Sequence, residues 1–166
     1  MKAIRDPVHG YIELDDLALA LIDTPEMQRL RRIRQLGFSN LVYPGANHSR
    51  FEHSLGTFHL ADIFMRMTSA DREGEEVRAA ALLHDIGHGP YSHATEQLLQ
   101  RYLRHGHEEV VSVLRRGEIA EVLDRFGMSS AEIARNIEGR RSYGQILNSE
   151  LDVDRMDYLV RDAHYT

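Results

Sequence analysis

Apolar residues recur at the spacing of α-helices along most of this chain, and glycine, proline and polar caps interrupt them at short intervals. Only the start, up to Leu14, has the pattern of a strand, because turn residues from Asp6 to Gly10 are followed by alternation. The longest uninterrupted apolar runs, Leu17–Ile22 and Ala79–Leu83, are far shorter than the roughly 20 residues of a membrane span. These patterns predict an all-α fold with a short N-terminal β-hairpin or extended arm, and no membrane segment.

Caps and chain breakers set the expected ends of the helices. Thr24 and Pro25 supply an N-cap and a proline at the first helical position, and Gly37 supplies the C-terminal stop. A second helix is expected from Phe51 to about Thr68. Its buried face is expected to carry His53, Gly56, Leu60, Ile63 and Met67, and its polar side His59, Asp62 and Arg66. Further helices are expected after a charged turn at residues 71–75 and over residues 91–104, 108–115, 119–126, 129–137 and 149–162.

The composition narrows the class of protein. A chain of 166 residues has the size of a single domain. It has no cysteine, which excludes disulfides and thiolate metal sites, so a metal would need imidazole, carboxylate or water as ligands. The formal net charge of −6 argues against a surface built to hold nucleic acid, although a local basic cleft is compatible with it. Residues 1–6 form no apolar leader, so we expect a cytoplasmic protein.

Histidine is the residue type that the chain uses in excess, with ten in all and eight of them between residues 48 and 107. His84 and Asp85 stand together at the end of an apolar helix, just before a break rich in glycine and proline at residues 86–90. A carboxylate in such a setting is costly unless it is paired or binds a metal. His53, on the apolar face of its own helix, needs a partner for the same reason. The alternative is that His84 and Asp85 simply cap a helix.

A third part of the candidate site lies near the C-terminal end of the chain. Asp154, Tyr158 and Asp162 recur at helical spacing and therefore share one edge of a helix. Two imidazoles and two carboxylates, from His53, His84-Asp85 and Asp154, suit a borderline or hard divalent ion with room for water or substrate. Such an ion lowers the pKa of water from about 15.7 to near 7, which suits hydrolysis of phosphoesters and phosphoanhydrides.

The order of these residues resembles the H…HD…D signature of the HD-domain metal-dependent phosphohydrolases. The surrounding sequence is similar to one branch of that family, the deoxynucleoside triphosphate (dNTP) triphosphohydrolases, which include the dGTPases and the SAM-and-HD-domain dNTPase. The resemblance implies a single HD-domain helical bundle over residues 1–166, truncated at its C-terminal end relative to the family. The segments that carry it are residues 23–25, 28–31, 35–37, 44–46, 50–56, 84–93 and 152–162.

The resemblance also implies roles for individual residues and a homo-oligomeric protein. One divalent ion, with Mn, Fe, Zn, Ni and Mg all open, would be held by His53, His84, Asp85 and Asp154. The phosphates and sugar of a dNTP would contact Gln35, Leu36, Arg50, Arg155, Tyr158 and Asp162, the last two flanking the deoxyribose. The catalytic group would comprise His93 above the metal, His88 nearer the phosphates, Glu96 to orient His93, and His107.

Several of these roles have a simpler alternative. His93 could be a surface histidine near the start of a helix, and Glu96 an exposed acid in its first turn. Arg50 could simply begin its helix, although a helix N-terminus is a poor place for a cation that serves no other partner. The five histidines given no role, His9 and His48 among them, are expected to be ordinary surface or structural residues.

The resemblance also leaves room for a second, regulatory site that binds a nucleotide. Asp23, Gln28 and Arg31 match positions that help to bind an activating nucleotide between subunits in the SAM-and-HD-domain branch. They could equally be a helix cap and two exposed helix residues.

Three functional hypotheses follow. The leading one is a metal-dependent phosphohydrolase that splits a dNTP into deoxynucleoside and inorganic triphosphate. A second keeps the metal site but acts on another nucleotide or a phosphomonoester, against which the sugar contacts expected of Tyr158 and Asp162 weigh. A third is a non-catalytic nucleotide or nucleic-acid binding module, which the short C-terminal end favours and the complete ligand set and His93 oppose.

Overall fold

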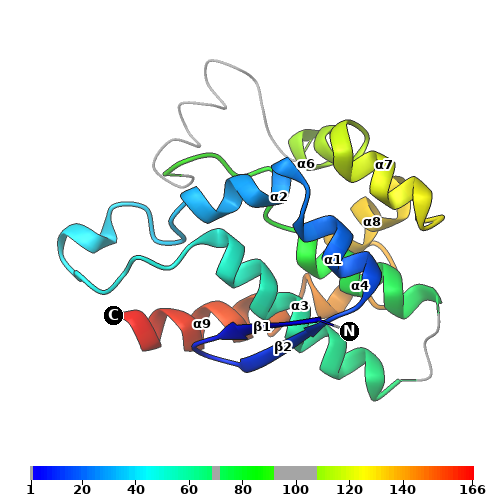
Figure 1. Ribbon diagram of the computed structural model, residues 1–166. Helices are drawn as coiled ribbons and strands as arrows, with labels where there is room; N and C mark the ends of the chain where they lie inside the picture. Colours follow the sequence, from blue (N-terminus) through cyan, green and yellow to red (C-terminus); the bar gives the residue numbers. More distant parts are fainter. Residues whose placement is uncertain (1, 69–71, 92–107) are drawn as a thin grey trace.

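The computed structural model describes residues 2–68, 72–91 and 108–166, and these residues are mostly helical (Figure 1). The chain starts with an antiparallel hairpin in which Lys2 lies opposite Leu14. Its strands are β1 (Lys2–Asp6) and β2 (Gly10–Leu14). The α-helices are α1 (Asp16–Ile22), α2 (Pro25–Arg29), α3 (Arg50–Arg66), α4 (Arg72–Leu83), α6 (Glu108–Leu114), α7 (Gly117–Arg125), α8 (Ser130–Ile137) and α9 (Val153–Tyr165). The predicted helical class and the N-terminal hairpin are confirmed.

Helix α3 organises the molecule, because it packs against α4 on one side and α9 on another, with β2 also in contact. Figure 1 shows α9 and the hairpin side by side next to α3, while α6, α7 and α8 gather at the other end of the molecule. Helix α4 joins the two parts, since it also packs on α8. The end of α4 and the start of α9, far apart in the sequence, are thereby brought together along α3.

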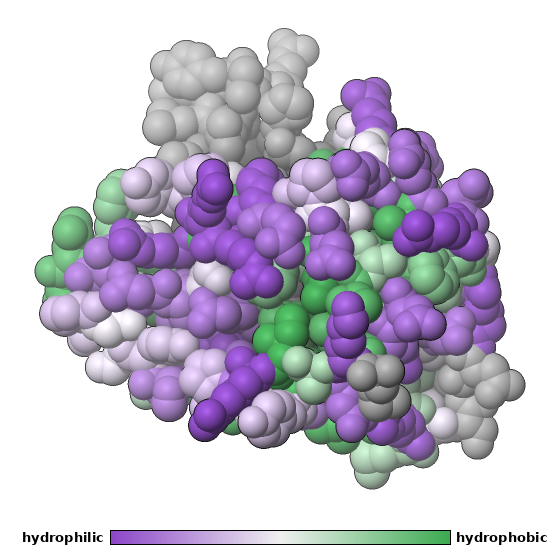
Figure 2. Space-filling model, in the orientation of Figure 1, coloured by the Kyte–Doolittle hydropathy of each residue, from purple (hydrophilic) through white to green (hydrophobic). Residues whose placement is uncertain are grey.

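The core consists of aliphatic side chains that these contacts remove from water. Leu82, Leu83 and Ile86 at the end of α4 are completely buried, as are Ile12 of the hairpin and Leu21 of α1. On the face in Figure 2 polar residues predominate, and hydrophobic ones gather in a band between α1 and the hairpin. No helix within the described ranges combines the length and the apolar content that a bilayer crossing requires.

Helix α3 differs from the amphipathic helix that its sequence predicts. Its N-terminal half is buried on nearly every side, because α4, α9 and β2 surround it. In its second half only one side is buried, and that side carries Ala61, Asp62 and Met65, whereas Ile63 and Met67, which the spacing placed on the buried face, are exposed. Asp62, predicted on the polar side, is buried and accepts a hydrogen bond from Arg78 of α4 at 3.1 Å.

Helix α2 is shorter than predicted. Thr24 caps it as expected, but the helix gives way to a 3₁₀ turn at residues 30–32, and Ile33 has an extended backbone. The cause is a tertiary contact, since Arg34 pairs with Ser49 in an isolated antiparallel bridge and draws the chain out of the helix well before Leu36.

The other predicted helices that the structure describes begin within a few residues of the predicted positions. Ser129, the first residue of the helix predicted at 129–137, caps α8, and Asp152 caps α9, which begins at Val153 rather than at Ser149. Helix α4 already begins at Arg72, inside the predicted charged turn. Almost all of the helix predicted at 91–104 lies outside the described residues.

Candidate functional site

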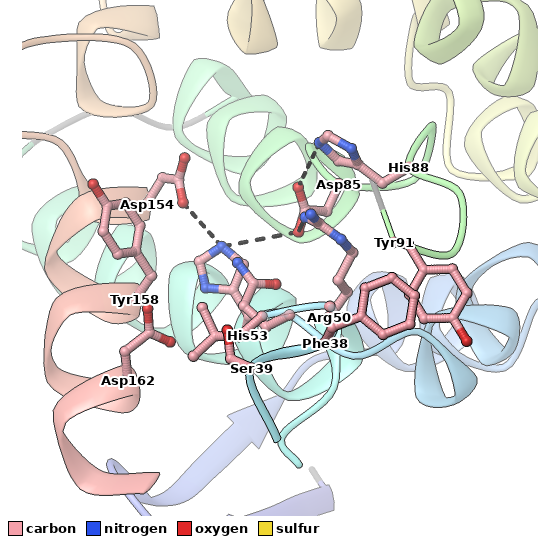
Figure 3. A pocket seen from close by; sticks show the side chains of 13 residues that line it. Phe38, Ser39, Arg50, His53, Asp85, His88, Tyr91, Asp154, Tyr158 and Asp162 are labelled. Atoms are coloured by element: carbon pink, nitrogen blue, oxygen red, sulfur yellow. Dashed lines mark hydrogen bonds and ion pairs between the residues drawn. The ribbon is translucent and has the colours of Figure 1, made fainter. Parts of the chain in front are cut away.

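Three elements converge on one group of potential metal ligands. His53 lies on α3, His84 directly follows α4, and Asp154 is in the first turn of α9. One ligand atom from each lies within 4.8 Å of the others. The Nε2 atom of His53 is 3.2 Å from Nε2 of His84. It is also 2.9 Å from Oδ1 of Asp154, a contact marked in Figure 3. Three of the four residues predicted as metal ligands therefore meet at one point.

The hydrogen bonds of the two histidines leave both Nε2 atoms able to coordinate an ion. Nδ1 of His84 lies 2.8 Å from the carbonyl oxygen of Ala81, which can only accept, so this nitrogen donates its hydrogen. Nδ1 of His53 donates in the same way to Oδ2 of Asp157 at 2.7 Å. Two imidazole nitrogens 3.2 Å apart also have the separation expected of neighbouring ligands, each about 2.0–2.1 Å from one ion.

The charge around His53 favours a cation. Burial alone would lower the pKa of His53, but the hydrogen bonds to Asp154 and Asp157 outweigh burial and raise the pKa to about 9. The carboxylates that stabilise this positive charge would also favour a metal cation at the same place, where the cation would replace the Nε2 proton. The donor set of two imidazoles and a carboxylate fits Mn, Fe, Zn or Ni, so the residues present are compatible with the ion that the sequence predicted.

Asp85, the fourth predicted ligand, borders this group and is buried. Its Oδ2 accepts a hydrogen bond from Nη1 of Arg50 at 2.6 Å, and its Oδ1 lies 3.3 Å from Nε2 of His88. Burial alone would raise the pKa of Asp85, but the electrostatic interactions with the neighbouring His84 imidazole and Arg50 guanidinium hold that pKa well below its usual range. Arg50, the first residue of α3, thus has the additional partner that a cation at a helix N-terminus requires.

A cavity of about 550 Å³ opens beside these residues, within the roughly 300–1,000 Å³ of typical ligand pockets. Figure 3 shows Asp154, Tyr158 and Asp162 along one wall, on α9, with His53 between them and the opposite wall. The predicted substrate contacts that line the cavity are Gln35, Leu36, Arg50, Tyr158 and Asp162, and His88 and Tyr91 also line it.

Other predicted residues lie elsewhere. Arg155 is exposed and does not line the cavity, and its Nη1 donates to the carbonyl oxygen of Glu150 at 3.1 Å. His93, Glu96 and His107 lie outside the described residues.

Two of the three residues of the predicted regulatory site, Gln28 and Arg31, make local hydrogen bonds. Nε2 of Gln28 donates to the carbonyl oxygen of Ile22 at 2.7 Å, and Nε of Arg31 donates to Oε1 of Gln28 at 2.9 Å. Asp23 is exposed at the end of α1.

The sequence reasoning missed the residues behind the ligands. Asp157 and Arg161 are completely buried on α9 and joined by hydrogen bonds, and His9 of the hairpin turn reaches the same carboxylate at 2.6 Å. His48 is also buried, with Nε2 2.8 Å from Oδ1 of Asp162. His9 and His48 are thus structural residues of the hairpin turn and of a loop, but their carboxylate partners on α9 were not predicted. The i, i+4 spacing of Asp157 and Arg161 in the sequence could have indicated this ion pair, because each residue directly precedes a predicted site residue, Tyr158 or Asp162.

We expect Gly56→Ala to destabilise the protein by about 2 kcal/mol, because the added carbon has no room. It would overlap Oδ1 of Asp157 and lie 2.5 Å from Nη2 of Arg161. At an exposed helical position, replacing glycine by alanine stabilises a protein by about 1 kcal/mol. The control is the reverse change, Ala163→Gly, at an exposed position of α9, which measures this difference in helix propensity in the same chain. Urea unfolding measures both. A Gly56→Ala variant as stable as the parent would contradict this close approach of α3 and α9.

Comparison with known proteins gives a match to the HD domain family over residues 50–162. An uncharacterized protein of Methanocaldococcus jannaschii is 45% identical over 167 residues, which cover 100% of this chain and 34% of that protein. The human protein named deoxynucleoside triphosphate triphosphohydrolase SAMHD1 is 33% identical, with 99% of this chain and 33% of that protein covered. The Dictyostelium discoideum SAMHD1 homolog is 36% identical, with 99% of this chain and 36% of that protein covered.

The fold is also found in a solved structure. A hypothetical protein from Aquifex aeolicus superimposes with a TM-score of 0.88 at 38% identity, covering 99% of this chain and 46% of that chain. The present chain spans about a third of the length of the curated relatives described above.

Proposed function

Because the chain belongs to the HD domain family, we propose that it forms the catalytic core of a metal-dependent phosphohydrolase that acts on dNTPs. The products would be a deoxynucleoside and inorganic triphosphate. The observation that carries the proposal is the group formed by His53, His84 and Asp154, which opens onto a cavity of nucleotide-compatible size. The relatives named dNTP triphosphohydrolases support the substrate class.

One divalent ion would be held by His53, His84 and Asp154, with Asp85 at its edge. When bound, such an ion neutralises phosphate charge and lowers the pKa of water. Arg50 would bind phosphate oxygens from the cavity wall, because Asp85 holds its guanidinium in place and its Nε is buried without a hydrogen-bond partner among the described residues.

The reaction itself needs a proton for the leaving group. The oxygen of water joins the α-phosphorus, the bond from that phosphorus to the 5′-oxygen breaks, and the 5′-oxygen takes up a proton. An imidazole suits this transfer near neutral pH. We propose His93 for it on the strength of the sequence resemblance, and His88, which lines the cavity, as a donor to the phosphates.

A turnover panel tests the proposal against its alternatives. The protein is incubated with dNTPs, a cyclic nucleotide and p-nitrophenyl phosphate, each with Mn²⁺, Mg²⁺, Zn²⁺ or Ni²⁺. Turnover of dNTPs with release of triphosphate supports the proposal. Turnover of the other compounds alone would support a metal-dependent phosphohydrolase with a different substrate. Binding of dNTPs without any turnover would support a non-catalytic binding module.

Asp162→Ala is expected to raise KM for dNTPs by about 10- to 100-fold, the value of a hydrogen bond to a charged group. Its carboxylate lines the cavity, is fixed by His48, and can accept a hydrogen bond from a sugar hydroxyl. Steady-state kinetics measure the change, with the exposed histidine replaced in His164→Ala as the control. If KM were unchanged in Asp162→Ala, the sugar would lie elsewhere.

A homo-oligomeric assembly, a cytoplasmic location and a regulatory nucleotide at Asp23, Gln28 and Arg31 stay predictions of the sequence resemblance.

A further inference from the structure

The buried carboxylate of Asp157 lies directly behind the candidate metal centre. Its Oδ2 accepts from Nδ1 of His53 at 2.7 Å and from Nε of Arg161 at 2.9 Å. Its Oδ1 accepts from Nε2 of His9 at 2.6 Å and from Nη2 of Arg161 at 3.0 Å. Four donors match the four lone-pair positions of an ionised carboxylate. The orientation of Asp157 is therefore determined by three side chains from three separate elements.

His9 reaches this carboxylate because the hairpin turn is itself anchored. Oδ1 of Asp6 accepts hydrogen bonds from the backbone nitrogens of Val8 and His9, both at 2.9 Å. Nη1 of Arg161 donates to Oδ2 of the same Asp6 at 2.8 Å. Arg161 thus connects the turn to α9, and the ring of His9 is held against Asp157 with only 13% of its side chain exposed.

We propose that His9 and Asp157 are positioning residues for the metal centre. His9 fixes the carboxylate of Asp157, and Asp157 fixes the ring and tautomer of His53, so that Nε2 of His53 presents its lone pair to the ion. A ligand histidine whose other ring nitrogen donates to a carboxylate is better oriented and a stronger ligand, and losing such a partner typically costs 10- to 100-fold in metal affinity. The N-terminal hairpin is in this way part of the metal centre. The proposal rests on the metal centre proposed above, but not on its substrate.

A purely structural role for the same residues makes a different prediction. If His9 only held the hairpin on α9, any change that loosened the hairpin would have the same effect on metal binding. Leu14→Ala provides that comparison, since Leu14 is a buried residue of β2 outside the hydrogen-bonded network. His9→Phe removes the donor and keeps a ring, whereas His9→Gln keeps a donor of similar reach.

The test is the affinity of the full chain for Mn²⁺ alone, measured by electron paramagnetic resonance of the free ion, with circular dichroism to verify folding. We expect about 10-fold weaker binding in His9→Phe, 10- to 100-fold weaker binding in Asp157→Asn, and parental affinity in His9→Gln and Leu14→Ala. Parental affinity in His9→Phe, or equal losses in His9→Phe and Leu14→Ala, would overturn the proposal.

The readout separates this inference from the proposed function. A parent that binds Mn²⁺ but hydrolyses no dNTP contradicts the proposed activity, while the ranking of the variants still supports or overturns the role of His9. A parent that binds none of Mn²⁺, Zn²⁺, Ni²⁺ or Fe²⁺ overturns both.

Discussion

Replacing His84 by alanine should lower kcat for dNTP hydrolysis by at least about 10³-fold. The side chain supplies one of the two imidazole nitrogens of the metal group, and Ala81 holds it with its Nε2 toward His53. A catalytic ion contributes several kcal/mol of transition-state stabilisation, and each 1.36 kcal/mol corresponds to a tenfold change in rate. Steady-state kinetics measure the loss of kcat, and metal analysis of the purified variant measures the loss of the bound ion that should accompany it.

A surface histidine serves as the matched control for this change. His164→Ala removes an exposed imidazole from α9 and should leave both activity and metal content unchanged. Asp154→Asn is a second variant, with nearly the size of the natural side chain, in case His84→Ala folds poorly. A folded His84→Ala or Asp154→Asn protein with full metal content and more than a tenth of the parental rate would contradict the ligand assignment.

Arg161→Met should lower the free energy of unfolding by about 3–5 kcal/mol, because it leaves the carboxylates of Asp6 and Asp157 buried without their cation. Nη1 of Arg161 is 2.8 Å from Asp6, its Nε is 2.9 Å from Asp157, and all three side chains are buried. Methionine retains much of the volume, so the loss reports on charge rather than on a cavity. Urea unfolding of parent and variant gives the difference.

Arg66→Met is the control for arginine removal in general. Its guanidinium is mostly exposed and lies 2.8 Å from Asp62, so the expected cost is at most about 1 kcal/mol. Equal and small effects of the two substitutions would show that the network formed by Asp6, Asp157 and Arg161 does not hold the hairpin on α9.

Local sequence signals predicted most of the helix ends correctly. Ser129 and Thr24 cap their helices because short side chains with an oxygen satisfy free backbone amides within a few residues. Local signals could not show that Ile33 would be extended, since that depends on the bridge between Arg34 and Ser49. Nor could periodicity show that the first half of α3 is buried on nearly every side, or that Ala61, Asp62 and Met65 form the buried side of its second half.

The candidate site was predictable to the extent that its chemistry is carried by adjacent or helically spaced residues. His84 with Asp85, and Asp154 with Tyr158 and Asp162, are of this kind. His9 is 148 residues from Asp157 and reaches it only through the folded hairpin, so no pattern in the sequence announces the contact. The position of Arg50 at a helix N-terminus indicated that its guanidinium needs a partner, but the sequence did not identify that partner as Asp85.

The first products formed from a dNTP decide whether the chain has the proposed activity. The full chain is incubated with dGTP and Mn²⁺, the paramagnetic ion is removed, and the products are analysed by ³¹P nuclear magnetic resonance. We expect inorganic triphosphate. Deoxyguanosine should appear in equal amount by chromatography, and neither product should form without a divalent ion. Orthophosphate or pyrophosphate as the first product, or an unchanged nucleotide spectrum with every metal, would show that the chain is not a dNTP triphosphohydrolase.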